Sequence, residues 1–206
     1  MDSTASAQRA PRSSRQARSA ERRRRIFQAL HDCVIDKGYT RTTLADIAAG
    51  AGMSASHLLY YFRGKEDILE QYFENVSEKF LARIGDRGDA AARDRIEHLA
   101  DLWFRGEAST RTEIGFMLEC FGAAVHDEVL RVTKAEFDLR CKDHLVAIFR
   151  AAPACYLGDD GDAAEVAYAM MIGLRSAVYF DQAMDLATAH RIFRDTLLKI
   201  ASLEDA

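Results

Sequence analysis

The sequence contains little proline and few cysteines, and both shortages narrow the folds open to it. Pro11 and Pro153 are the only prolines among its 206 residues. A proline inside a helix costs about 3 kcal/mol, so this scarcity leaves long helices possible, and alternating β-branched runs typical of strands are hard to find. The four cysteines lack C-x-x-C spacing, which argues against a zinc site and a disulfide framework. The chain is therefore predicted to be all-α, with reduced thiols.

The sequence also lacks the segments and motifs that mark membrane proteins and enzymes. No apolar run approaches the roughly 18 residues of a membrane helix, and the arginine-rich start has no apolar segment of a secretion signal. We find no H-E-x-x-H, G-x-S-x-G, P-loop or paired-carboxylate pattern, and "GDDGD" at 158–162 falls short of a calcium loop. We expect a cytoplasmic protein with no membrane partner, no metal, no cofactor and no catalytic residues.

Charge is unevenly divided along the chain, whose formal net charge is −4. Residues 1–25 hold eight arginines and two acids, a net +6, while the remaining 20 basic and 30 acidic residues give −10. This asymmetry points to a polyanionic partner at one end, although an idle solvated tail has the same composition. We assign residues 1–18 to a disordered Arg-rich extension and expect the first helix to begin near Ser19.

Two short helices joined by a glycine turn are predicted within residues 40–62, with Ser54 capping the second. A helix-turn-helix needs a small residue where the helices approach, a residue that accepts positive φ, and an apolar residue that locks the angle. Ala48, Gly52 and Leu58 supply these three properties in that order. An ordinary helical hairpin shares the pattern, so these residues alone leave both interpretations open.

Residues 22–69 resemble the N-terminal domain of the TetR family of bacterial transcriptional regulators (AcrR/BetI-like members). The family pattern is met at Gly38-Tyr39, Thr42-Thr43-Leu44, Ile47-Ala48, Ala51-Gly52-Met53-Ser54, Leu58, Tyr61-Phe62, Lys65 and Ile68-Leu69. Ser56 replaces a usual glycine and Leu59 a usual tyrosine, so the base readout does not transfer from relatives. The resemblance implies about nine helices, with a DNA-binding domain at 19–64 and a helical effector-binding and dimerisation domain at 65–206.

In a helix-turn-helix the second helix lies in the major groove, and neighbouring donors bind phosphates. Here that helix is predicted at 54–61, with Leu58 pointing back to the core. The outward residues predicted to contact bases are Ala55, Ser56, His57 and Tyr60. The predicted phosphate contacts are Thr43, Tyr61, Lys65, Arg22, Arg23, Arg24 and Arg25.

The resemblance further implies a small-molecule effector and a homodimer. The candidate effector pocket is an apolar, sulfur-rich set with one arginine: Trp103, Phe104, Phe116, Met117, Cys120, Phe121, Met170, Met171, Arg175 and Tyr179. The last two predicted helices, about 162–184 and 187–203, carry apolar stripes that suit a dimer interface: Val166, Met170, Leu174, Ala177, Phe193, Leu197 and Ile200. For both sets, ordinary core packing remains the alternative.

These features favour a ligand-responsive repressor that a small hydrophobic effector releases from an inverted-repeat operator in double-stranded DNA. An activator of the same fold is the main alternative. A helical adaptor that does not bind DNA would require the N-terminal resemblance to be accidental, and an enzyme would require a catalytic constellation that the sequence lacks.

Overall fold

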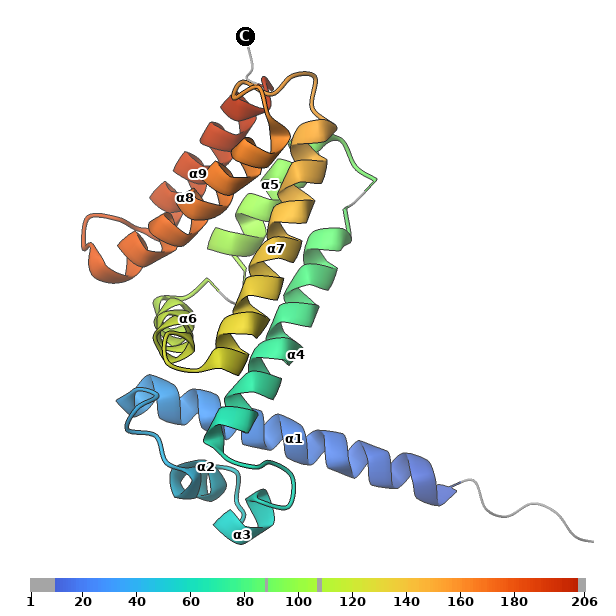
Figure 1. The fold of residues 1–206 in the computed structure, drawn as a ribbon, viewed down its shortest axis with the longest axis vertical. Helices are drawn as coiled ribbons and strands as arrows, with labels where there is room; N and C mark the ends of the chain where they lie inside the picture. Colours follow the sequence, from blue (N-terminus) through green and yellow to red (C-terminus); the bar gives the residue numbers. More distant parts are fainter. Residues whose placement is uncertain (1–9, 88, 107–108, 204–206) are drawn as a thin grey trace, which may run out of the picture. The chain divides into compact units, whose positions relative to one another are not determined.

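The structure is a computed structural model that describes residues 10–87, 89–106 and 109–203. Across these residues all regular secondary structure is helical, which confirms the predicted all-α fold of about nine helices (Figure 1). The helices are α1 (Ala10–Lys37), α2 (Leu44–Gly50), α3 (Ala55–Leu58), α4 (Lys65–Gly85), α5 (Ala92–Phe104), α6 (Arg111–Ala124), α7 (Glu128–Arg150), α8 (Asp160–Phe180) and α9 (Leu186–Ile200).

Six of the helices begin after a residue whose side chain caps them. An oxygen of each capping side chain accepts a backbone N–H from the first turn of α2, α3, α6, α7, α8 and α9; the caps are Thr43, Ser54, Thr110, Asp127, Asp159 and Asp185. Such a cap stabilises a helix by about 1 kcal/mol. These short polar residues explain locally why the helices start where they do.

Helix α1 begins at Ala10 and not near Ser19 as the sequence predicted. The added segment contains three arginines, two alanines and one glutamine, which favour helix, and Pro11 falls in the first turn, where its missing N–H breaks no hydrogen bond. The predicted disordered extension is therefore helical over 10–18, and residues 1–9 lie outside the described residues. The helix ends before Gly38, which takes a φ of 81°.

The chain divides into two compact units after Leu69, slightly beyond the predicted domain boundary at the start of α4. The N-terminal unit contains α1, α2, α3 and the first residues of α4. Its core is a set of large apolar side chains that are at most 2% exposed: Ile26, Leu30, Val34, Ile47, Leu58, Phe62, Ile68 and Leu69.

The C-terminal unit is a helical bundle built from the rest of α4 through α9. Within it α7 and α9 both pack against α8, and α5 packs against α9; Figure 1 shows α8 and α9 side by side. The rings of Phe104 and Phe193 lie with centroids 5.4 Å apart in the core between α5 and α9.

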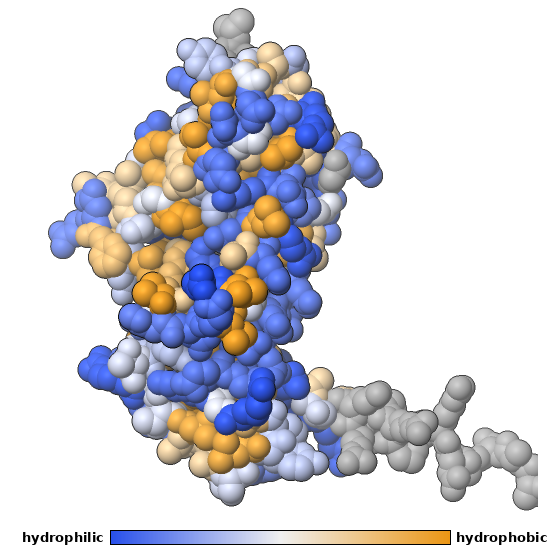
Figure 2. Space-filling view, in the orientation of Figure 1, coloured by the Kyte–Doolittle hydropathy of each residue, from blue (hydrophilic) through white to orange (hydrophobic). Residues whose placement is uncertain are grey.

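None of the helices in the described part of the chain is both long and apolar enough to cross a membrane. On the face drawn in Figure 2, apolar side chains form separate patches among hydrophilic ones. The large apolar side chains that stay exposed include Leu59, Tyr60, Val166 and Phe180.

Candidate functional site

The turn between α2 and α3 has the backbone that its glycine predicts. Gly52 takes a φ of +67°, in the left-handed region that other residues rarely adopt. The N–H of Met53 donates to the carbonyl of Ala48 at 2.9 Å, and that of Gly52 to Ala49 at 3.0 Å. This pair of bonds is a Schellman motif, so the turn both ends α2 and sets the direction of α3.

The three predicted helix-turn-helix core residues lie where the spacing places them. Ala48 is 1% exposed and Leu58 is 0% exposed, and Ser54 accepts the backbone N–H of His57 at 3.2 Å. The regular part of α3 is shorter than the predicted helix at 54–61. After Leu58 the chain continues in helical turns, in which the N–H of Tyr61 donates to Leu58 at 2.9 Å.

The outward surface of this segment carries the predicted base-reading side chains. Ser56, His57 and Tyr60 are exposed, and Ala55 is half-buried. Tyr60 is 79% exposed, and the neighbouring Leu59, which the sequence singled out only as a departure from the family pattern, is 51% exposed. The surface therefore offers three hydrogen-bonding side chains, Ser56, His57 and Tyr60, and one apolar side chain, Leu59, to a partner.

Two predicted phosphate contacts, distant in the sequence, are brought together. Nη1 of Arg22 on α1 donates to the hydroxyl of Tyr61 at 2.7 Å. The guanidinium of Arg23 lies over the ring of Phe62, 5.4 Å from its centroid. This arrangement places one side of α1 against the end of the recognition segment.

Arg24 and Arg25, the other two arginines of the run at residues 22–25, differ in their contacts. Arg24 pairs with Glu21 at 2.8 Å on an exposed part of α1, and its hydrogen bond lowers the pKa of that carboxyl. Arg25 is exposed. Because Arg24 already has an acidic partner, Arg25 is the better candidate for a contact with phosphate.

Lys65, predicted to contact phosphate, is partly engaged within the fold, and its phosphate contact stays a prediction. Its ammonium donates to the carbonyls of Tyr39 and Thr42, both at 3.0 Å, and lies 4.4 Å from the centroid of the Tyr39 ring. Two of its three donors are therefore used within the N-terminal unit. Lys65 fastens the start of α4 to the segment between α1 and α2, because those carbonyls are the acceptors that face it.

Thr43, an exposed residue predicted to contact phosphate, is also engaged inside the fold, and its phosphate contact stays a prediction. Its hydroxyl donates to Asp46 at 2.5 Å and accepts the backbone N–H of Asp46 at 3.2 Å. The resulting capping box holds the first turn of α2. The ammonium of Lys37 lies 2.6 Å from the same carboxylate, and the hydrogen bonds from Lys37 and Thr43 hold the pKa of Asp46 well below its usual range.

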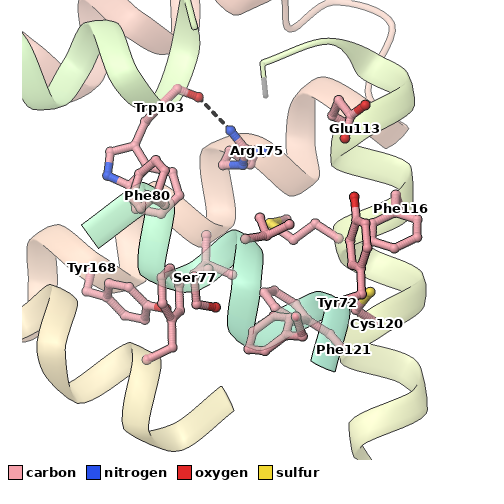
Figure 3. A pocket seen from close by; sticks show the side chains of 15 residues that line it. Tyr72, Ser77, Phe80, Trp103, Glu113, Phe116, Cys120, Phe121, Tyr168 and Arg175 are labelled. Carbon is pink, nitrogen blue, oxygen red and sulfur yellow. Dashed lines mark hydrogen bonds between the residues drawn. The ribbon is translucent and has the colours of Figure 1, made fainter. Parts of the chain in front are cut away.

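The C-terminal unit contains a cavity of about 110 Å³, drawn in Figure 3. Six of the predicted pocket residues line it: Trp103, Phe116, Met117, Cys120, Phe121 and Arg175. The remaining lining residues were not predicted: Tyr72, Phe73, Val76, Ser77, Phe80, Glu113, Phe137, Tyr168 and Ile172. Five of these come from α4, whose apolar residues recur at helical spacing.

Four predicted pocket residues do not line this cavity. Phe104 and Met171 are at most 1% exposed and belong to the core. Met170 packs at the edge of that core, and the ring of Tyr179 lies against Gly115, where a Cβ would come within 2.6 Å of it. These corrections share one cause. An apolar stripe on a helix predicts that a face is covered, but it does not distinguish packing against another helix from lining a cavity.

Burial changes the ionisation of two groups that line the cavity. It raises the pKa of the Cys120 thiol, which leaves this cysteine protonated and unreactive at neutral pH. Burial also raises the pKa of Tyr168, and so does the hydrogen bond that its hydroxyl donates to Asp138. Neither side chain therefore brings a negative charge to the cavity.

The predicted dimer face is partly wrong. Phe193 and Leu197 are 0% exposed and Ile200 is 6% exposed, all within the chain's own core. On α8, by contrast, Val166 is 47% exposed, while Met170, Leu174 and Ala177 are half-buried. The apolar face of α9 is covered by other helices of its own unit, so only the α8 part of the set remains available to a second copy.

Comparisons with known proteins match both halves of the chain. The family model described as "Bacterial regulatory proteins, tetR family" matches residues 26–72. The model described as "BetI-type transcriptional repressor, C-terminal" matches residues 92–202, which is more than half of the chain.

Two curated relatives agree with these matches. HTH-type transcriptional regulator BetI 1 of Chromohalobacter salexigens is 37% identical over 76 residues, which span 37% of this chain and 34% of that protein. HTH-type transcriptional regulator BetI of Rhizobium meliloti is 26% identical over 155 residues, 74% of this chain and 75% of that protein.

Solved structures share the fold. A putative transcriptional regulator from Saccharomonospora viridis in complex with choline has a TM-score of 0.78 at 21% identity, covering 86% of this chain and 96% of that one. A transcriptional regulator from Rhodococcus sp. Rha1 has a TM-score of 0.76 at 18% identity, covering 87% of this chain and 96% of that one.

Proposed function

This chain belongs to the TetR family of bacterial regulatory proteins and has a C-terminal domain of the BetI type, and from that premise we propose that it represses transcription as a homodimer. It is a DNA-binding, ligand-responsive transcriptional regulator and not an enzyme. In the proposal it acts in the bacterial cytoplasm on an inverted-repeat operator. A small molecule that enters the cavity of the C-terminal unit releases the operator.

The observation that carries the proposal is the surface beside the Gly52 turn. Ser56, His57 and Tyr60 project from a short helix whose direction the turn sets, and one helix-turn-helix reads only half of a two-fold site. Reading the whole two-fold site thus requires a dimer. The exposed side of α8 supports dimerisation. Val166 and Phe180 keep 47% and 70% of their surface exposed there, and dimer interfaces are enriched in such side chains.

Helix α4 is the proposed link between ligand and DNA. Its first residue, Lys65, is tied to the N-terminal unit by two hydrogen bonds, and its residues Tyr72 to Phe80 contribute to the cavity lining. A ligand weakens DNA binding only to the extent that it prefers the conformation that does not bind DNA. A ligand that displaces α4 meets this condition when the displaced helix belongs to the conformation that does not bind DNA.

The test of the function is binding to DNA from the region upstream of the chain's own gene. We expect dimeric binding to an inverted repeat, with the affinity falling on the order of 10³-fold or more between 50 and 200 mM salt if about six or more phosphates are contacted. Titration of labelled fragments at several salt concentrations measures both the number of chains bound per fragment and the salt dependence of the affinity. A scrambled repeat of equal length is the control, and equal affinity for both fragments would overturn the proposal.

Replacing His57 with alanine is expected to change which base pairs the operator tolerates. His57 is exposed on the recognition segment, and loss of one base contact costs about 1–3 kcal/mol at one position of the site. Arg25→Ala is the matched variant, since an exposed arginine on α1 would contact phosphate. It should weaken binding to all sequences alike and lower the salt slope by about one. Selection from a randomised operator library distinguishes the two; identical profiles would contradict the assignment of His57.

A further inference from the structure

The cavity contains a buried positive charge. Arg175 on α8 is 4% exposed and lines the cavity together with aromatic and apolar side chains. Its Nη1 donates to the carbonyl of Trp103 at 2.6 Å, and its guanidinium carbon lies 5.5 Å from the centroid of the Trp103 ring. Figure 3 shows this bond at one side of the cavity, with Glu113 on the neighbouring α6.

We propose that the effector is a small molecule that combines one apolar ring with an anionic group, and that Arg175 binds the anionic group. The inference rests on the proposed function, because it takes the cavity to be the effector site. It goes further by assigning the ligand's charge and the residue that recognises it.

A buried cation such as Arg175 favours an anionic partner because burial is costly for a charge. A guanidinium removed from water loses solvation, and an anion that forms hydrogen bonds with it recovers part of that loss. The guanidinium has five N–H donors in a planar fork that matches a carboxylate, and Nη1 is the one that donates to the carbonyl of Trp103. Burial lowers the pKa of Arg175 to about 10, so the side chain is still charged at neutral pH.

An acidic residue lines the same cavity. Glu113 is that residue, and its charge favours the charged form of Arg175. Glu113 is partly exposed whereas Arg175 is buried. Water screens a partly exposed charge more than a buried one, so the charge of Arg175 is the less screened of the two. A ligand anion would compete with Glu113 for the same guanidinium.

The protein's own cation already lies over the cavity's indole. Trp103 is the only tryptophan in the chain, and the guanidinium of Arg175 lies over its ring. A ligand cation on the same ring would be repelled by that guanidinium, because like charges at close range disfavour each other. The Trp103 side of the cavity therefore favours an anionic group over a cation such as the choline found in the Saccharomonospora viridis regulator.

The volume of the cavity suits a ligand group of about one ring. It is about 110 Å³, and a cavity of roughly 150 Å³ is known to hold benzene. Aromatic side chains surround the space in tilted and edge-on pairs, with the Phe80 and Trp103 centroids 4.2 Å apart and those of Tyr72 and Phe116 5.2 Å apart. A single aromatic ring packs among such side chains favourably.

Calorimetric titration of the full chain with probes of nearly equal shape tests the inference. The probes are phenylacetate, phenylacetamide and 2-phenylethylammonium, with choline as a fourth. We expect phenylacetate to bind at least about tenfold more tightly than the amide, because hydrogen bonds to a charged group are stronger, and the two cations to bind most weakly. Tightest binding of the amide or of a cation, or no binding of any probe, would overturn the inference.

Two variants with opposite expected effects on phenylacetate binding test whether Arg175 binds the anionic group. Arg175→Met should remove the preference for phenylacetate over the amide, whereas Glu113→Gln should strengthen phenylacetate binding by removing the competing carboxylate. Arg175→Lys, which keeps the charge, should retain part of the preference if Arg175→Met fails to fold by circular dichroism. An unchanged preference in Arg175→Met, or weaker phenylacetate binding in Glu113→Gln, would contradict the assignment. Operator binding without ligand, measured in parallel, shows separately whether the proposed function holds.

Discussion

Replacing Leu58 with alanine is expected to lower the free energy of unfolding of the N-terminal unit by about 2–5 kcal/mol, and to abolish operator binding. Leu58 is 0% exposed and closes the core between α2 and α3. A unit as small as this one has little stability to lose. Loss of far-ultraviolet circular dichroism on heating measures the effect.

Leu59 provides the matched control for this variant, because it is the same residue type at the next position and is 51% exposed. Leu59→Ala should change the unfolding free energy by no more than about 0.5 kcal/mol. Trp103 lies in the C-terminal unit, so tryptophan fluorescence should report an unchanged transition for that unit in both variants. Equal destabilisation by the two variants would show that Leu58 does not lock the helix-turn-helix.

Replacing Phe193 with alanine is expected to destabilise the C-terminal unit by about 3–5 kcal/mol. Phe193 is 0% exposed, and its ring packs on that of Phe104 with the centroids 5.4 Å apart. The cavity left by a deleted ring is only partly closed by relaxation of the neighbours. Chemical unfolding followed by the fluorescence of Trp103, next in sequence to Phe104, measures the loss.

Phe180, which is 70% exposed at the end of α8, is the control for Phe193. Phe180→Ala should cost less than about 1 kcal/mol in unfolding; any effect it has should be on dimerisation. If Phe193 instead lay between two copies, as its apolar stripe also allowed, Phe193→Ala would change the sedimentation of the native protein and leave the unfolding of the monomer unchanged.

The candidate site was only partly predictable, and the differences have a common cause. Lys65 and Thr43 are polar residues near a predicted DNA surface, yet their donors are used by the carbonyls of Tyr39 and Thr42 and by Asp46. A sequence shows that a side chain has donors to offer. Which acceptors lie within reach depends on how the helices pack.

The effector pocket shows the same limit for apolar residues. The aromatic side chains of α4 recur at helical spacing, which predicts that one face is covered. The spacing does not distinguish a face that packs against another helix from one that lines a cavity. Tyr72 and Phe80 therefore escaped prediction as pocket residues, although they line the cavity.

The sequence by itself determined the local features of this protein. The turn at Gly52, the cap at Ser54 and the buried Leu58 all depend on residues within a few positions of one another, where backbone geometry and capping leave little choice. Tertiary structure decided what depends on distant contacts. Arg175 meets the Trp103 carbonyl 72 positions away, and Phe193 is covered by α5 and not by a second copy. Periodicity marks a face as apolar, but only the assembled helices select the surface that covers it.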